Sequence, residues 1–290
     1  MRLISFHAAG GVTLGVVADG YAIAAARLVP DGPATLTALL AGGDDPLEAL
    51  RAAADPARIR AAGEPLEQFQ LAAPVPRPGK IIAIGRNYAD HATEGGAVAP
   101  PAPLIFAKWP SSVIGPNEAI RWDPVLTAEV DYEAELAVVI GRRARRISEA
   151  DALSHVLGYT CLNDVSARDL QFGDGQWVRG KSLDTFCPMG PQLVTLDELR
   201  DPNDLAIAAT VNGEKRQAAR TSEMLFSVSR IIAHCSQAFT LEPGDVIATG
   251  TPSGVGVYRD PPTFLADGDV IRISIEGIGD LANTCRIDHP

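Results

Sequence analysis

Hydrophobic residues in the long second part of the chain fall into short runs separated by glycine, proline and polar residues. Short apolar runs with such boundaries are typical of β-strands. Helical periodicity is clearest over residues 221–239, where Val228, Ile231 and Cys235 lie on one face at a repeat of about 3.6 residues. A shorter helix is expected over residues 148–157, which begin with a Ser-x-x-Asp cap. The pattern predicts a mainly β protein of the α+β class, with strands at residues 80–84, 104–108, 132–140, 158–162, 205–211, 246–249 and 270–275.

The beginning of the chain has a different pattern. Three apolar runs broken by glycine predict a small antiparallel meander, at residues 3–6, 12–17 and 21–28. An alanine-rich helical segment follows over residues 47–62, and Pro56 is expected to divide it into two short helices. Residues 74–79 contain three prolines and predict a stiff linker. We therefore expect a small N-terminal α/β domain, the linker and a larger domain, over residues 1–73, 74–79 and 80–290.

Three carboxylates adjoin apolar strands. Glu133 and Glu135 lie two positions apart in the run 132–140, so both side chains point to one face of the strand. The rest of that run is apolar and predicts burial, where adjacent carboxylates need a cation or a shared proton. Asp164 follows another strand, and three carboxylates suit Mg²⁺, Mn²⁺ or Ca²⁺. The alternatives are a solvent-facing edge strand for the glutamates and an Asx turn for Asp164.

Other polar residues offer proton transfer and anion binding. His91 and Glu94 become neighbours if they share a helical turn, and a carboxylate beside an imidazole makes it a better general base. Alone, this spacing is more often found in surface or capping residues. Lys181, between glycine and serine, can meet an anionic oxygen or be exposed. The glycine-rich stretch around Thr251 lacks the ending of a P-loop, but its amides and hydroxyl can hold a carboxylate.

The composition of the chain limits which classes of partner and which cellular compartment are expected. The chain has 290 residues, is 46% hydrophobic and 21% charged, and carries a net charge of −11, which argues against nucleic acid or an anionic membrane as the main partner. No apolar run reaches the about 18 residues of a membrane helix, and we expect no signal peptide at the N-terminus. The four cysteines form no C-x-x-C pair. Buried, reduced thiols in a cytoplasmic protein are the expectation.

Taken together, the motifs resemble the fumarylacetoacetate hydrolase family. The similar stretches occur in the family's order: I-G-R-N-Y-A-D-H-A-T-E (84–94), D-Y-E-A-E-L-A-V-V-I-G (131–141), N-D-V-S-A-R-D-L-Q (163–171), G-K-S-L-D-T-F-C-P-M-G-P (180–191) and G-D-V-I-A-T-G-T-P-S-G-V-G (244–256). The resemblance implies a catalytic domain of mixed, rolled β-sheets and a homodimer. It also implies a Mg²⁺ cofactor, with Mn²⁺ or Ca²⁺ as alternatives.

The resemblance assigns roles residue by residue. It implies Glu133, Glu135 and Asp164 as metal ligands. It implies His91, Glu94 and Lys181 as catalytic residues, with His91 and Glu94 on a segment that covers the substrate. The positions that the resemblance assigns to substrate binding are Arg86, Tyr88, Lys108, Arg168, Gln171 and Thr251. An additional metal-side aspartate of the larger founding hydrolases has no equivalent that the sequence identifies.

The expected chemistry is metal-dependent cleavage of a carbon–carbon bond. The resemblance and the residues favour hydrolysis of a 2,4-dioxo acid of the acylpyruvate or fumarylpyruvate kind, with the His91–Glu94 pair activating water. The same centre serves oxaloacetate decarboxylation and 2-hydroxymuconate-type isomerisation or decarboxylation, which are alternatives. A binding protein that retains the fold without catalysis is a more remote one. The expected partner is a small 2-oxo or 2,4-dioxo acid.

Overall fold

The N-terminal part combines a small group of strands with short helices. A computed structural model describes residues 1–288 of the chain. The elements before the proline-rich segment are β1 (Arg2–Ala8), β2 (Gly11–Ala18), β3 (Tyr21–Ala24), α1 (Ala25–Leu28), α2 (Leu36–Ala41), α3 (Asp44–Ala53), α4 (Pro56–Ala62), β4 (Glu64–Pro65) and β5 (Leu71–Ala72). The helical segment is divided as expected, because Pro56 begins α4 and the side chain of Asp55 caps it.

The larger part is rich in strands, and helices α5–α8 are inserted between them. Its elements are β6 (Ile81–Gly85), α5 (Ala89–Glu94), β7 (Leu104–Lys108), β8 (Val113–Ile114), β9 (Ile120–Trp122), β10 (Val130–Asp131), β11 (Ala134–Ile140), β12 (Val156–Asn163), β13 (Ser166–Ala167), α6 (Arg168–Asp174), α7 (Val178–Lys181), β14 (Cys187–Thr195), β15 (Ala206–Val211), β16 (Glu214–Arg220), α8 (Val228–Ala238), β17 (Val246–Ala248), β18 (Val270–Ile275) and β19 (Gly279–Ile287). Short 3₁₀ turns occur at 66–68, 110–112, 152–155, 221–223 and 256–258.

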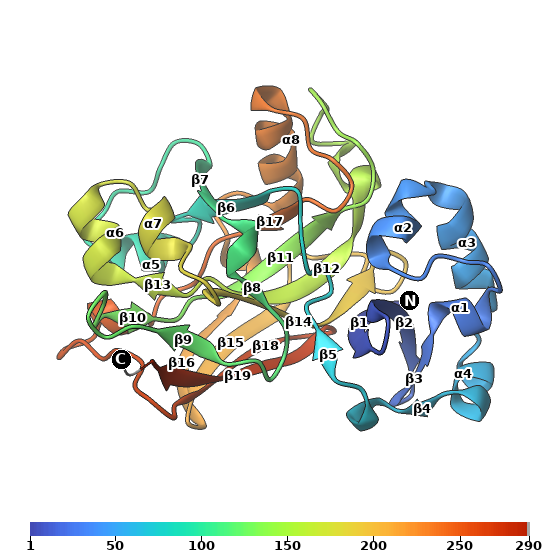
Figure 1. Cartoon of the computed structure of the whole chain (residues 1–290). Coiled ribbons are helices and arrows are strands. Elements are labelled where there is room, and N and C mark those ends of the chain that lie inside the picture. The colour runs from blue at the N-terminus through green and yellow to red at the C-terminus, as the bar shows by residue number, and fades with distance from the viewer. Residues whose placement is uncertain (289–290) are drawn as a thin grey trace.

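Two mixed sheets contain most of these strands, and β10 pairs with β13 in a separate two-stranded sheet, which confirms the predicted mainly β, α+β class. The larger sheet has twelve strands in the order β4-β3-β2-β1-β14-β12-β11-β17-β6-β7, with β5 beside β1 and β8 beside β14. The smaller sheet runs β16-β15-β18-β19-β9. Most pairs are antiparallel, whereas β17 with β6, β19 with β9 and β14 with β8 are parallel. Figure 1 shows the N-terminal strands joining the rest of the molecule where β1 lies beside β14.

The central strands β11 and β12 are buried along their whole length, as their apolar sequences predict. One hydrophobic cluster packs between the two sheets and includes Leu136, Tyr159 and Ile273. A second cluster joins both parts of the chain, because Leu3 and Leu50 share it with residues of β11 and β14. The division into two domains at 74–79 remains a prediction, since the sheet and this cluster continue across it.

Three predicted elements differ from the structure. The helix expected over 221–239 begins at Val228, after a 3₁₀ turn and an extended segment. The helix expected over 148–157 is reduced to a 3₁₀ turn at 152–155, because β12 begins at Val156 and pairs with β11. The strand expected to continue to Leu28 ends at Ala24, where the four-residue helix α1 begins.

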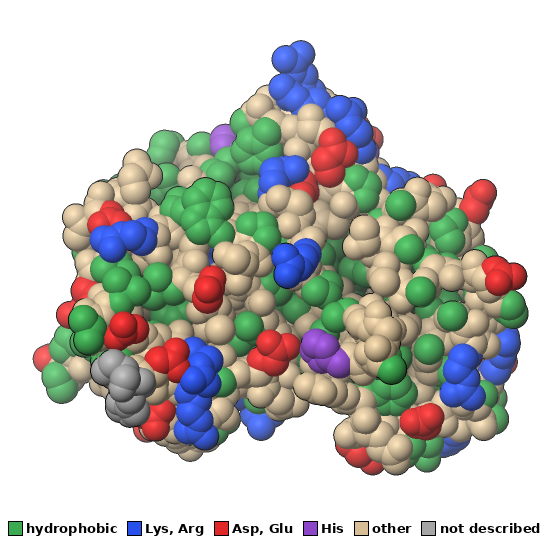
Figure 2. Space-filling view, viewed as in Figure 1, with side chains coloured by type: hydrophobic (Ala, Val, Ile, Leu, Met, Phe, Trp, Pro, Cys, Tyr) green, Lys and Arg blue, Asp and Glu red, His purple; other side chains and the backbone are tan. Residues whose placement is uncertain are grey.

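The surface carries both signs of charge. Figure 2 shows acidic and basic side chains interspersed over one face, with basic side chains gathered on the projection at the top. None of the helices in the described part of the chain is long and apolar enough to cross a membrane.

Candidate active site

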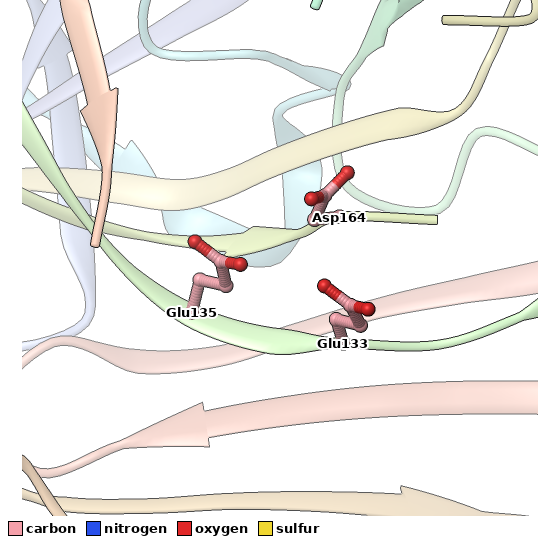
Figure 3. Close-up of side chains that lie close together, drawn as sticks. All are labelled: Glu133, Glu135 and Asp164. Atoms are coloured by element: carbon pink, nitrogen blue, oxygen red, sulfur yellow. The ribbon is translucent and has the colours of Figure 1, made fainter. Parts of the chain in front are cut away.

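The metal-binding candidates meet where β11 begins and β12 ends. The antiparallel register places Ala134 opposite Asn163, so the residues just outside the paired strands are also neighbours. The Asp164 N–H donates to the Glu133 carbonyl oxygen at 2.9 Å. Glu133, Glu135 and Asp164 are buried, and one oxygen of each lies within 4.8 Å of the others. Figure 3 shows Asp164 close to the two glutamates, which come from one ribbon.

Three buried cations surround this carboxylate triad. The Lys181 ammonium donates to Glu133 at 2.7 Å and to Asp164 at 2.8 Å. Lys108 approaches Asp164 from the other side, with Nζ 2.6 Å from Oδ1. The Arg168 guanidinium lies 2.7 Å from the second oxygen of Glu133. Two of the three carboxylates are thereby paired, which allows them to remain ionised in a buried site.

The third carboxylate, Glu135, is electrostatically different. Among the described residues no lysine or arginine forms an ion pair with it, and its Oε2 accepts a hydrogen bond from the Gly250 N–H at 2.8 Å. Burial, reinforced by the negative charges of Asp164 and Glu133, raises the pKa of Glu135 well above its usual value. Burial would also raise the pKa of Glu133, but Lys181 and Arg168 outweigh it and lower that pKa to about 2.

The residues present fit a divalent cation. Three buried carboxylates within reach of one ion are the oxygen donors that Mg²⁺, Mn²⁺ and Ca²⁺ take. Glu135 lacks a compensating positive charge, and a bound cation would supply it. Metal binding and burial therefore make opposite demands on Glu135, since the ligand must be ionised while burial favours the neutral acid.

The candidate general base lies on α5. His91 and Glu94 share a helical turn, and His91 Nδ1 is 2.8 Å from Glu94 Oε1. The other oxygen of Glu94 accepts a hydrogen bond from the Gly254 N–H at 2.9 Å. This arrangement fixes the imidazole and leaves Nε2 available for proton exchange.

The glycine-rich loop around Thr251 binds carboxylates, but they are the protein's own. Its amides at Gly250, Gly254 and Gly256 donate to Glu135, Glu94 and Asp131 respectively. Gly250 has φ +100°, and a β-carbon there would lie 2.7 Å from the Asn87 side chain. The glycines therefore let the backbone approach these acids closely. The loop amides were expected to bind an anion, and the anions that these three amides bind are carboxylates of the protein itself.

Two of the three triad carboxylates, Glu133 and Glu135, open with His91 on the same small cavity, of about 90 Å³. Most of the sequence-predicted site residues line it, namely Arg86, His91, Glu133, Glu135, Arg168, Gln171, Lys181 and Thr251. Four predicted residues do not line this cavity. Asp164 and Lys108 are hydrogen-bonded to the lining residue Lys181, and Glu94 is hydrogen-bonded to the lining residue His91. Tyr88 lines a neighbouring cavity of about 270 Å³, and its buried hydroxyl has no partner within residues 1–288.

Comparison with known proteins identifies the family. Residues 80–286 match the family model described as fumarylacetoacetate (FAA) hydrolase C-terminal. The chain belongs to the fumarylacetoacetate hydrolase family. The mitochondrial oxaloacetate tautomerase FAHD2A of Bos taurus is 43% identical over 289 residues, which cover 98% of this chain and 91% of that protein. The oxaloacetate tautomerase YisK of Bacillus subtilis (strain 168) is 50% identical over 221 residues, 75% and 73% of the two chains.

Solved structures agree with this assignment. The fumarylacetoacetate hydrolase of the psychrophilic Exiguobacterium antarcticum is 40% identical, with a TM-score of 0.87 over 99% of this chain and 100% of that one. The family expected from the motifs is confirmed. The chain is an enzyme of the fumarylacetoacetate hydrolase family.

Several residues of the candidate site have no local sequence pattern that marks them as functional. Asp131 is fully buried and accepts hydrogen bonds from Arg168 Nε at 2.9 Å and from the Gly256 and Val257 amides. Its place directly before the Tyr-Glu-x-Glu motif was its only signal. Aromatic side chains also line the cavity, at positions 106, 172, 177 and 258. They are spread over three segments, so no local pattern marks them as neighbours.

Proposed function

We propose that this enzyme catalyses the keto–enol tautomerisation of oxaloacetate or a closely related 2-oxo acid, with Mg²⁺ as the cofactor and Mn²⁺ or Ca²⁺ as alternatives. The observation that carries the proposal is the single cavity lined by both Glu133 and Glu135 of the carboxylate triad and by His91 of the His91–Glu94 pair. The names of the relatives from Bos taurus and Bacillus subtilis support this choice of reaction. The reaction needs enolate stabilisation, which a cation on the triad would supply, and proton transfer, which His91 would carry out.

Size and charge favour a small anionic substrate. The cavity of about 90 Å³ is far below the about 300 Å³ or more of pockets that hold drug-sized ligands. Three buried cations face four buried carboxylates when Asp131 is counted with the triad. A divalent cation reverses the sign of that balance and leaves one net positive charge, which attracts a carboxylate.

The roles of the side chains follow from their contacts. A divalent cation held by the triad would supply Lewis-acid stabilisation for negative charge developing on the C2 oxygen of the substrate. His91 takes a proton from C3 and delivers one to the C2 oxygen, so the substrate keeps all its atoms. Burial alone would lower the pKa of Lys181, but Asp164 and Glu133 raise it, so its ammonium remains a cation. Lys181 therefore acts as a fixed positive charge and not as a base.

The test follows the enol of oxaloacetate by its ultraviolet absorbance, with purified, Mg²⁺-loaded protein and with the same protein after chelation. We expect chelator-sensitive acceleration of the approach to keto–enol equilibrium without net loss of oxaloacetate. Pyruvate is measured in parallel, because its release would reveal decarboxylation instead. A metal-loaded protein that leaves the rate of interconversion at the buffer value would refute the proposed reaction.

Hydrolysis of a 2,4-dioxo acid is the second candidate. A specific observation favours it: Glu94 holds the His91 ring by one nitrogen, an arrangement suited to activating water. The solved relative from Exiguobacterium antarcticum bears the name of a hydrolase. Incubation with acetylpyruvate, followed by loss of the diketo acid and release of pyruvate, distinguishes the two. Chelator-sensitive cleavage would favour hydrolysis. The homodimeric state and the cytoplasmic location remain predictions for size-exclusion and localisation measurements.

A further inference from the structure

Gln217 joins the two sheets at the active site. It is the one fully buried residue of β16, an edge strand of the smaller sheet. Its Oε1 accepts a hydrogen bond from the Ala134 N–H at 2.9 Å, between the two metal-binding glutamates. Its Nε2 donates to the Thr251 hydroxyl at 2.8 Å and to the Pro252 carbonyl oxygen at 2.7 Å.

The orientation of this amide group is determined by its partners. The Ala134 N–H is a donor, so only the amide oxygen can face it. The Pro252 carbonyl is an acceptor, so only the amide nitrogen can face that side. Exchanging the two atoms would set donor against donor and acceptor against acceptor. The Gln217 amide nitrogen is therefore the donor that meets Thr251.

This contact determines what Thr251 can do. A threonine hydroxyl has one proton to donate, and here its oxygen already accepts a hydrogen bond from Gln217. Thr251 is 2% exposed, lines the cavity, and donates to no acceptor within residues 1–288. A buried hydroxyl proton without an acceptor is costly, so a ligand that offers an oxygen would be bound there.

We propose that Gln217 is a positioning residue that holds the Thr251 hydroxyl as a hydrogen-bond donor to an anionic oxygen of the ligand. Gln217 acts through Thr251 and does not itself line the cavity. A substrate that presents a carboxylate or carbonyl oxygen to the Thr251 hydroxyl is accepted. A substrate that presents a hydroxyl donor to it is disfavoured. The inference rests on the proposed function only for the 2-oxo acid class of the ligand.

The test is a double-mutant cycle on ligand affinity. Mg²⁺-loaded protein is titrated with pyruvate and followed by intrinsic fluorescence, because Trp177 lines the cavity. Thr251→Val removes the donor and is expected to weaken binding about 10- to 100-fold, the range for a hydrogen bond to a charged group. Gln217→Met is expected to weaken it about tenfold by freeing the hydroxyl. Their combination should bind within about twofold of Thr251→Val alone.

Further measurements separate positioning from a structural role. Thr251→Ser keeps the hydroxyl and should restore most of the affinity. For oxaloacetate, Gln217→Met should raise KM more than it lowers kcat. Gln192→Met is the matched control, since Gln192 donates to the Ile278 carbonyl oxygen away from the cavity. The Gln192→Met variant should bind pyruvate with the same affinity as the unaltered protein.

The outcomes are distinct. Losses that multiply in the double variant, or unchanged affinity in both single variants, would overturn the positioning role while leaving the proposed function intact. Failure of the unaltered, metal-loaded protein to bind pyruvate or turn over any 2-oxo acid would refute the proposed function, and the inference with it. If Gln217→Met does not fold, Gln217→Glu replaces it, because its carboxylate would accept the Thr251 proton and weaken binding as Thr251→Val does.

Discussion

Replacing Asp131 by Asn tests the most heavily bonded acid of the site. Both Asp131 oxygens accept hydrogen bonds: Oδ1 from the Tyr132 and Gly256 amides, and Oδ2 from Arg168 and the Val257 amide. An asparagine amide group would have to face donors on one of these sides. The Arg168 guanidinium, 2.8 Å away, would also lose the charge that balances it in a buried environment.

The expected cost is large for an isosteric change. Breaking a buried ion pair by removing one partner destabilises a protein by about 3–5 kcal/mol. For a chain of this size that corresponds to a fall in Tm on the order of 10 °C. Activity should fall as well, because Arg168 also holds Glu133.

The assay is urea unfolding followed by circular dichroism, with thermal unfolding as a second measurement. Asp174→Asn is the matched control: it makes the same chemical change in an exposed pair with Arg179, where solvent screens the charges. The control should unfold at the same urea concentration as the unaltered protein. If Asp131→Asn unfolds there too, the assignment of Asp131 as a structural counter-ion is refuted.

Four further predictions concern metal, base and pH. Glu135→Gln should weaken Mn²⁺ binding by about 100-fold or more, measured by calorimetry, and an unchanged affinity would contradict its assignment as a ligand. Glu94→Gln should lower kcat about 100-fold with little change in KM, since it orients His91; full turnover would count against the pair. Mn²⁺ at about 100 times its Kd should raise the free energy of unfolding by about 2.7 kcal/mol, and the chelator should reverse the gain; a chelator-insensitive Tm would refute specific binding. Burial would raise the pKa of Asp197, but Thr195 and the terminal amino group lower it from 3.8 to about 2, so Asp197 stabilises the fold above about pH 4 and ceases to do so as the pH falls through about 2. Urea unfolding of Asp197→Asn should therefore differ from the unaltered protein at pH 6 and not at pH 2, and a constant difference would refute this role.

The strands were predictable where local pattern and burial agree. Residues 104–108 and 270–275 form β7 and β18 with the predicted bounds. The start of α8 was not predictable, because a distant residue determines it. The buried Asn87 accepts the Leu225 N–H with its carbonyl oxygen and the Phe226 N–H with its side chain. These bonds hold the segment extended, and Ser227 then caps the helix.

The candidate site also has a part that was predictable from local sequence and a part that was not. Glu133 with Glu135, and His91 with Glu94, are close in sequence, so strand and helix periodicity bring them together. The partners that make the site rigid come from far along the chain: 83 residues separate Ala134 from Gln217. A lone glutamine in a polar edge strand has no pattern that marks it. Only the packing of the two sheets brings it to the strand that carries the candidate metal ligands.

The pairing of β1 with β14 determines what happens to the protein if its N-terminal residues are removed. Leu3 pairs with Leu193, and Leu3, Leu50 and Met189 belong to one hydrophobic cluster. A protein begun at residue 80 would keep every predicted metal ligand, yet it would leave the β14 edge open to solvent and to other chains. The first 72 residues thus cover a strand edge that would otherwise be free to pair with another strand. Fusion partners or tags are best attached outside them, and a shortened version would call for a replacement strand.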